Sequence, residues 1–122
     1  MEKIINLTQH ACSNEQASEG VVEPSNKKAV QAALTFVEIP TKETILASAT
    51  TLAKIASQSG AKKAMIGGAP YLMGALEVAL KKVGIQPVYS FSERVSKEVV
   101  LEDGTTQKTS VFCHKGFISR RS

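Results

Sequence analysis

The chain alternates short apolar runs with longer segments whose apolar side chains recur every three or four positions. The runs at residues 3–7 ("KIINL"), 62–68 ("KKAMIGG") and 87–91 ("PVYSF") have the length and composition of buried strands. Residues 41–59 and 69–84 instead carry an apolar stripe at helical spacing. Strands that alternate with helices in this way predict βαβ units around a parallel sheet.

Capping signals indicate where several helices begin and end. Ser13 stands three residues before Gln16, the spacing of a capping box, so a short helix is expected from Ser13 to Gly20. Ser25 is expected to cap a further helix that runs to Ala33.

Two more segments are bounded by Pro and Gly. Residues 35–40 ("TFVEIP") are β-branched and aromatic in character, and Pro40 closes them. Gly60 is expected to end the helix at 41–59, while Pro70 suits the first turn of the helix that ends at Gly84.

A β-hairpin is predicted at the C-terminal end, because Asp103-Gly104 is a strong hairpin signal. A two-residue turn there sets the register, which pairs Glu102 with Thr105, Val95 with Phe112, Arg94 with Cys113, and Glu93 with His114. His114 would then return beside the cluster "SFSER" at residues 90–94. A Glu93–His114 surface pair of little energetic value is the alternative, and one bulge would change the register.

Length and composition predict one α/β domain over residues 1–122. We expect a small three-layer Rossmann-like fold with a mainly parallel sheet and the C-terminal β-hairpin. The net charge of +4 favours a small phosphorylated ligand, but it is too low for a protein that binds duplex nucleic acid. With no Trp and only six Phe and Tyr, platforms for stacking single-stranded bases would be hard to assemble.

Targeting and redox signals point to the cytoplasm. The N-terminal apolar run is too short for a signal peptide, and no segment has the length of a transmembrane helix. Cys12 and Cys113 are therefore expected to be reduced thiols. The basic pairs Lys62-Lys63, Lys81-Lys82 and Arg120-Arg121 are expected to be solvated ends of elements.

Polar or glycine-rich residues follow three of the predicted strands. Open α/β sheets bind ligands at the carboxyl ends of their strands, so these residues are expected to meet in one crevice. They are Asn6, Thr8, Gln9 and His10 after the first strand, Gly67, Gly68 and Ala69 after the second, and Ser90, Ser92 and Arg94 at the third.

Each candidate also has a simpler interpretation. Gly67-Gly68 could serve only a tight turn, and no Lys-Ser/Thr follows them as in a P-loop. His10 could be an ordinary loop residue. No metal site is expected, because His10, Cys12, Cys113 and His114 lack a zinc spacing. No Ser-His-Asp order or nucleophile elbow is visible.

Three stretches together resemble a known family. "NLTQHACSNEQ" (6–16) is similar to the strand-to-helix opening of small CRISPR-associated Rossmann-fold (CARF-related) proteins. "PVYSFSERVSKEVVLEDGTTQKTSVFCHKGF" (87–117) resembles their C-terminal block, and "GGAPYLMGAL" (67–76) their centre. Residues 21–60 do not align.

The resemblance implies a homodimer that binds a cyclic oligoadenylate second messenger and cleaves it without a metal or other cofactor. Such ring nucleases switch off type III CRISPR antiviral signalling. It implies that Ser92 and Thr8 orient the ribose hydroxyl, that His10 acts as base or acid with His114 as a second candidate, and that Arg94 pairs with phosphate. Gly67 and Gly68 would offer backbone N–H groups to phosphate.

Two other functions remain open. The chain could be a non-catalytic nucleotide sensor or a regulator that acts through a partner. It could also be a small interaction protein whose hairpin edge pairs with another chain.

Overall fold

The computed structural model describes residues 2–119. In chain order its elements are β1 (Ile4–Asn6), α1 (Asn14–Ser18), β2 (Val21–Val22), α2 (Lys27–Leu34), α3 (Lys42–Ser59), β3 (Lys63–Met65), α4 (Pro70–Lys82), β4 (Gln86–Val100) and β5 (Thr106–Ile118). The predicted pair Arg120-Arg121 lies outside the described residues. None of the described helices is long and apolar enough to cross a membrane.

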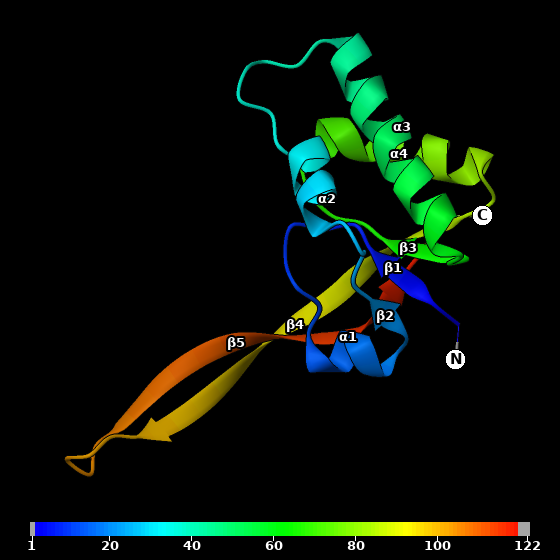
Figure 1. Ribbon diagram of the computed structural model, residues 1–122. Helices are drawn as coiled ribbons and strands as arrows, with labels where there is room; N and C mark the ends of the chain where they lie inside the picture. The colour runs from blue at the N-terminus through cyan, green and yellow to red at the C-terminus, as the bar shows by residue number, and fades with distance from the viewer. Residues whose placement is uncertain (1, 120–122) are drawn as a thin grey trace.

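The strands form one mixed sheet in the order β2-β1-β3-β4-β5 (Figure 1). β1 is parallel to β2 and β3, and β3 is parallel to β4, whereas β4 and β5 form an antiparallel hairpin. The α/β class and the C-terminal hairpin are therefore confirmed. The two-residue strand β2 was not predicted, because Val21–Val22 is too short to show a period.

The two faces of the sheet are covered differently. Ile5 and Ala64 pack into the main core with Leu52 of α3 and Leu76 of α4, so α2, α3 and α4 cover one face. Their neighbours Ile4 and Met65 point to the other face, as the two-residue period of a strand requires. That face is covered by the loop after β1 and by α1, which contacts β2 and β5 (Figure 1).

Most predicted helix boundaries agree with the structure. Ser13 and Gln16 form the complete capping box of α1. Thr41 caps α3, and Gly60 ends it with φ of +79°, a conformation that favours glycine. The prediction for α2 was wrong by one residue: Asn26 accepts the hydrogen bond from the N–H of Ala29.

Residues 35–40 form no strand, despite their composition. They connect α2 directly to α3 and, within residues 2–119, pair with no strand of the sheet. Val37 and Ile39 are consequently almost fully exposed, at 93% and 96%.

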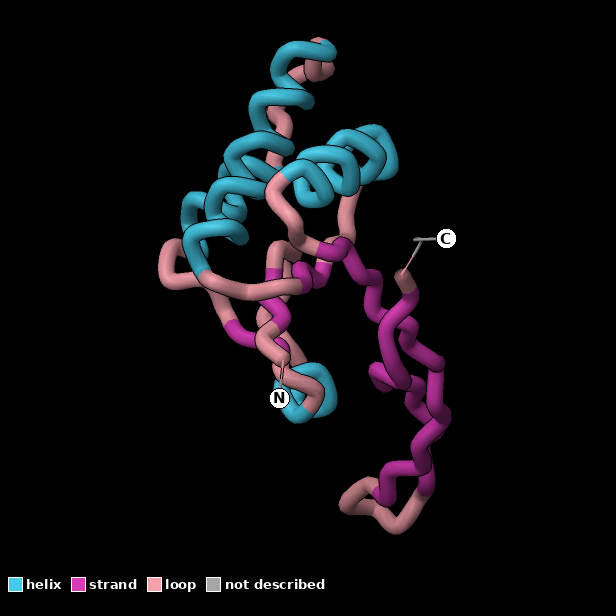
Figure 2. Tube along the Cα trace, turned by 90° about the vertical axis from the view of Figure 1, so that its right-hand side faces the viewer, coloured by secondary structure: helices cyan, strands magenta, loops and turns pink. Residues whose placement is uncertain are grey.

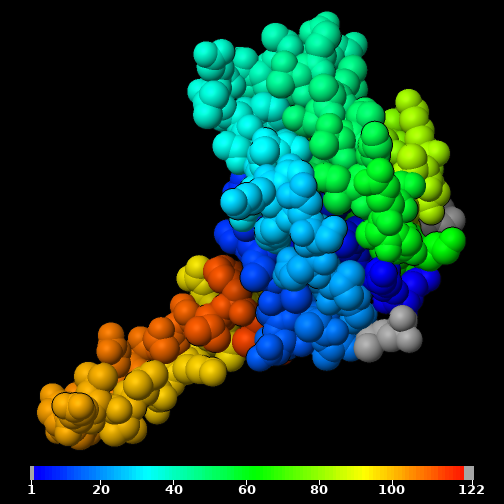
Figure 3. Space-filling view, viewed as in Figure 1, coloured from blue at the N-terminus to red at the C-terminus, as the bar shows by residue number. Residues whose placement is uncertain are grey.

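The hairpin continues beyond the sheet as a long two-stranded arm. The arm is residues 92–114, and it projects away from the helices in both ribbon and tube views (Figures 1 and 2). In the space-filling view it stands clear of the body over most of its length (Figure 3). Two strands without a third or a covering helix are marginally stable in water, so this arm lacks a core of its own.

The predicted register of the arm was wrong by one residue. His114 lies opposite Ser92 rather than Glu93, and Val95 lies opposite Val111. The turn is longer than predicted, because the N–H of Leu101 donates to the carbonyl of Thr105 around a three-residue loop.

Asp103 and Gly104 stabilise this longer loop. Asp103 Oδ1 accepts hydrogen bonds from the Thr105 hydroxyl at 2.6 Å and from its N–H at 3.0 Å. These two bonds hold the pKa of Asp103 below its ordinary value. Gly104 takes the left-handed conformation, with φ of +86°, that closes a three-residue loop.

A β-bulge restores the predicted register at the base of the hairpin. Phe91 lies opposite Gly116 while Ser92 lies opposite His114, so Lys115 is the extra residue on β5. The bulge turns His114 toward the face of β4 that carries Ser90 and Ser92. The alternative Glu93–His114 pair is absent among the described residues, and Glu93 instead lies 3.9 Å from Lys115.

Candidate functional site

A cavity of about 620 Å³ lies beside the carboxyl ends of β1 and β3 and beside β4 where it leaves the sheet. The structure thus brings the three predicted strand ends together, as expected for an open α/β sheet. The residues that line the cavity are Thr8, Gln9, His10, Ala11, Ser13, Gln16, Leu34, Met65, Ile66, Gly67, Gly68, Ala69, Tyr89, Ser90, Ser92, Phe112 and His114.

Asn6 stabilises the loop after β1, which forms part of the cavity wall. It is fully buried at the end of β1 and does not line the cavity. Its Oδ1 accepts hydrogen bonds from the N–H and hydroxyl of Thr8, at 2.9 and 2.7 Å. Its Nδ2 donates to the carbonyl of His10 and to the carboxylate of Glu23. Asn6 therefore fixes the shape of the loop that follows β1.

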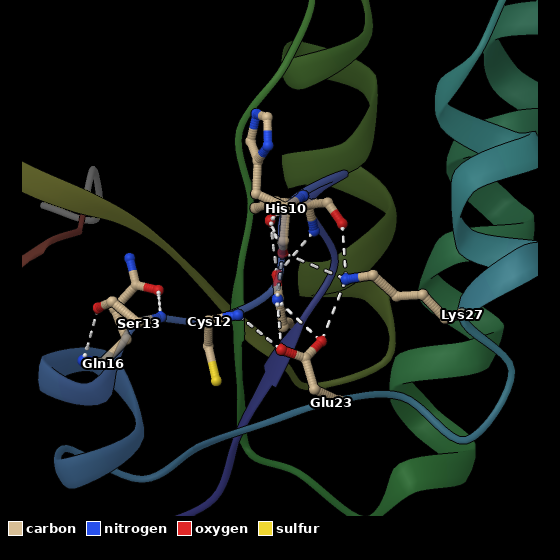
Figure 4. Close-up of polar contacts among 8 residues, drawn as sticks. His10, Cys12, Ser13, Gln16, Glu23 and Lys27 are labelled. Atoms are coloured by element: carbon tan, nitrogen blue, oxygen red, sulfur yellow. Dashed lines mark hydrogen bonds and ion pairs between the residues drawn. The ribbon is translucent and has the colours of Figure 1, made fainter.

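Glu23 and Lys27 complete the support of this loop (Figure 4). Lys27 donates to the carbonyls of Thr8 and His10 and pairs with Glu23 at 3.1 Å. Partial burial opposes ionisation of Glu23, but hydrogen bonds from the Cys12 N–H, Lys27 and Asn6 outweigh it and lower its pKa to about 2. The carboxylate of Glu23 therefore stays ionised where it contacts this loop.

The side chains of the loop differ in how free they are. The imidazole of His10 points away from Glu23 and Lys27 (Figure 4), and within residues 2–119 it has no hydrogen-bond partner. Gln9 donates a long bond of 3.3 Å to Thr35 at the surface. The hydroxyl of Thr8 is already bonded to Asn6. His10 and Gln9 are therefore the parts of this loop available to a ligand.

Backbone N–H groups line the cavity at the start of α4. Within residues 2–119, the N–H groups of Gly67, Gly68 and Ala69 donate to no protein atom. Gly68 has φ of +153°, which a residue with a side chain rarely adopts. Free N–H groups before a helix N-terminus favour a bound anion.

A serine, a histidine and a glutamate form a connected chain at the opposite wall. Ser90 Oγ lies 2.5 Å from His114 Nδ1, and His114 Nε2 lies 2.9 Å from Glu19 Oε2. Gln16 Nε2 donates to Ser90 Oγ at 3.1 Å while its Oε1 accepts from the Ser13 N–H. The side chain of Gln16 thus both caps α1 and positions the hydroxyl of Ser90.

Arg94 lies beyond the cavity, on the arm. Its guanidinium stacks over the ring of Phe112, 5.0 Å from the centroid, and Phe112 itself lines the cavity. Cross-strand pairing of Arg94 with Phe112 places both on the same face as Ser92. Arg94 therefore lies beside the cavity but does not line it.

Several contributors to the site were missed from the sequence, Glu23 and Lys27 of the loop support among them. Glu19 follows the five-residue helix α1 and contacts His114, which is 95 positions away in the chain. No local sequence pattern predicts this contact. Tyr89 and Phe112 look like ordinary strand residues. The hydroxyl of Tyr89 donates to the buried carboxylate of Glu77 at 2.6 Å, which anchors this part of the wall to α4.

No cluster of three or more His, Cys, Asp and Glu side chains that could hold a metal occurs within residues 2–119. Cys12 and Cys113 are free thiols. Burial, followed by the hydrogen bond and charge of Glu23, raises the pKa of the Cys12 thiol. Cys12 is therefore a protonated, packed side chain rather than an activated nucleophile.

Comparison with known proteins gives one result. No curated protein and no solved structure matches the chain. A family model does match, over residues 2–118, and its description is "Uncharacterized protein MJ1673 family". Since this match covers nearly the whole chain, the protein belongs to that family.

Proposed function

We propose that the protein binds a cyclic oligoadenylate in this cavity and cleaves it without a metal. The observation that carries the proposal is the convergence of free backbone N–H groups, a free imidazole and a serine–histidine–glutamate chain around one cavity. The resemblance to CARF-related proteins implies the same ligand. As part of this proposal, we expect the fold to be Rossmann-like and the protein to be cytoplasmic.

The proposed chemistry needs positioning and charge stabilisation rather than a cofactor. A ribose 2′-hydroxyl attacks the adjacent phosphorus when it is held in line with the leaving oxygen. The N–H groups of Gly67 and Gly68 bind the phosphate, and Arg94 approaches it from the arm. His10 at the rim gives a proton to the leaving oxygen and Ser92 faces the ribose, whereas the hydroxyl of Thr8 is already bonded to Asn6 and only shapes the loop.

The test incubates the purified protein with cyclic tri-, tetra- and hexa-adenylate in EDTA and separates linear from cyclic products. We expect linear products from one ring size. Intact rings after long incubation at high enzyme would overturn cleavage, and binding without cleavage would favour the sensor.

The substitution Arg94→Ala tests the role of Arg94 in the same assay. We expect it to weaken ring binding at least about tenfold, since a charge-assisted hydrogen bond contributes about 1.5–3 kcal/mol and about 1.4 kcal/mol is a factor of ten. Lys108→Ala is the control, because Lys108 is an exposed cation further out on the same face of the arm, opposite Glu98. Equal binding by the two variants would remove Arg94 from the site.

We also propose that two copies pair through their arms. Val95, Val99 and Val111 form the valine face of the arm, opposite the face that carries Arg94 and Phe112. Val99 and Val111 are 45% and 38% exposed. A second copy would cover this face and supply the packing that two strands alone lack.

The charged residues on the valine face are complementary to themselves across a twofold axis. Glu93 and Lys97 flank Val95 at equal spacing on β4. If Val95 meets Val95 of the partner subunit in antiparallel fashion, Glu93 meets Lys97 of the partner subunit, twice per dimer. The same surface keeps a third function open, in which the arm pairs with a different protein.

Sedimentation velocity tests the dimer. Val111→Asp places two like charges at the axis, and we expect it to raise the dimer dissociation constant at least tenfold, about 1.4 kcal/mol. Ser110→Asp is the control, because Ser110 lies on the other face. A wild-type protein that sediments as a monomer at every concentration would overturn the arm dimer.

A further inference from the structure

The hydroxyl of Ser90 lies at the junction between the domain and the arm. Three side chains surround its oxygen: His114 Nδ1 at 2.5 Å, Gln16 Nε2 at 3.1 Å and Ser92 Oγ at 3.4 Å. The residue also lines the cavity. Ser90 is therefore both tied to a buried histidine and exposed to whatever occupies the cavity.

Glu19 determines which nitrogen of His114 carries a proton. A carboxylate only accepts hydrogen bonds, so Nε2, at 2.9 Å from Glu19, must carry the hydrogen. When the ring is neutral, Nδ1 is bare and accepts the proton of the Ser90 hydroxyl. This is the arrangement in which a carboxylate orients a histidine toward a hydroxyl.

The donors and acceptors at Ser90 leave one position open. A serine oxygen has one hydrogen and two lone pairs. With His114 in that tautomer the hydrogen points to His114, and one lone pair accepts from Gln16. The remaining lone pair meets only Ser92, in the longest of the three contacts. A ligand hydroxyl that displaces Ser92 would donate its hydrogen to this lone pair.

His114 is unable to serve a ligand directly. Its side chain is 2% exposed, and both ring nitrogens already have partners. The ring also packs against Phe117, with the centroids 4.6 Å apart. Any proton that His114 exchanges with the cavity must therefore pass through Ser90.

We propose that Ser90 takes the proton of the attacking ribose hydroxyl, with His114 and Glu19 behind it as positioning residues that receive and stabilise that proton. The proposal rests on the function proposed above and adds the base of that reaction, while His10 remains its acid. Ser90 is the catalytic residue of the three, since its hydroxyl is the group that would contact the ligand while both ring nitrogens of His114 already have partners.

The step balances in atoms and charge. The 2′-oxygen forms a bond to phosphorus as its proton moves to Ser90 Oγ, and the proton of Ser90 moves to His114 Nδ1. The bond from phosphorus to the 5′-oxygen breaks, and that oxygen takes a proton from the imidazolium of His10. The products are a 2′,3′-cyclic phosphate and a 5′-hydroxyl. Solvent water then returns a proton to His10 and removes one from His114.

The test measures single-turnover cleavage and ring binding separately, with cyclic tetra-adenylate in EDTA or the ring size that wild type cleaves. Ser90→Ala should slow cleavage at least 100-fold, the usual range for loss of proton transfer, with binding changed less than threefold. Ser90→Thr keeps the hydroxyl and should retain cleavage. Ser96→Ala, further along the same face of the arm, is the control.

Glu19 has its own variants and a readout that fold stability does not affect. Glu19→Ala should slow cleavage about 100-fold, at the lower end of the range for loss of general acid–base catalysis. Long-range ¹H–¹⁵N spectra should show His114 protonated at Nε2 in wild type and at either nitrogen in Glu19→Ala. Glu15→Ala, an exposed position in the same helix, is the control.

The outcomes separate this proposal from the function on which it rests. Wild type that cleaves no ring overturns both. Wild type that cleaves while Ser90→Ala cleaves equally well overturns the proton path alone. A ring of His114 protonated only at Nδ1 in wild type also overturns it.

Discussion

Replacement of Asn6 by alanine is expected to lower the free energy of unfolding by about 3 kcal/mol, because it leaves buried polar groups without partners. The N–H of Thr8 loses its acceptor, the hydroxyl of Thr8 loses the nearer of its two acceptors, and the carbonyl of His10 loses one of its donors. Chemical denaturation followed by circular dichroism measures the change. Ring binding should weaken as well, since the loop that carries His10 and Gln9 is no longer fixed.

Asn14→Ala is the matched control for Asn6. Asn14 is exposed at the start of α1, and its side chain makes no hydrogen bond within the described residues. We expect this substitution to change the free energy of unfolding by less than about 0.5 kcal/mol. If both variants were equally stable, the hydrogen bonds of Asn6 would have no part in holding the loop.

Glu23→Gln is expected to lower the free energy of unfolding at pH 7 by about 1–2 kcal/mol. A fall in pKa from 4.5 to about 2 corresponds to about 3 kcal/mol. The carboxylate is 40% exposed, however, and solvent screening reduces that figure. Gln keeps one oxygen for the Cys12 N–H but loses the charge that pairs with Lys27.

The pH dependence of this effect has a definite sign. The pKa of Glu23 is lower in the folded state, so its contribution is complete above the ordinary value of 4.5 and is lost as the pH falls toward 2. Wild type and Glu23→Gln should therefore differ at pH 7 and converge near pH 2. Denaturation curves between these limits measure it, with the exposed Glu38→Gln as control. A difference that persisted unchanged to pH 2 would contradict the proposed network.

Features that depend on a few neighbouring residues were predictable from the sequence. Ser13 and Gln16 form the capping box that their spacing predicts, and Gly60 ends α3 because a left-handed residue is needed there. Thr8, Gly67 and Ser90 meet at one cavity because parallel strands end at the same edge of a sheet.

Features that depend on distant contacts were not predictable. Asp103-Gly104 is compatible with loops of two or three residues, and the hydrogen bonds of Thr105 select the longer one. Val21–Val22 becomes a strand only because β1 lies beside it. Glu19 joins the site because α1 packs against β5, and that contact is set by the whole sheet.

The bulge at Lys115 has a consequence for how the arm can vary in length. Ser90 and His114 are joined by the base of the hairpin and by the bulge, not by the turn. One residue added to each strand beyond Ser92, or one removed from each, would leave this pair in contact while it reverses which face the outer arm presents. Relatives with longer or shorter arms should therefore keep the hydroxyl and imidazole together, although the number of residues between them differs.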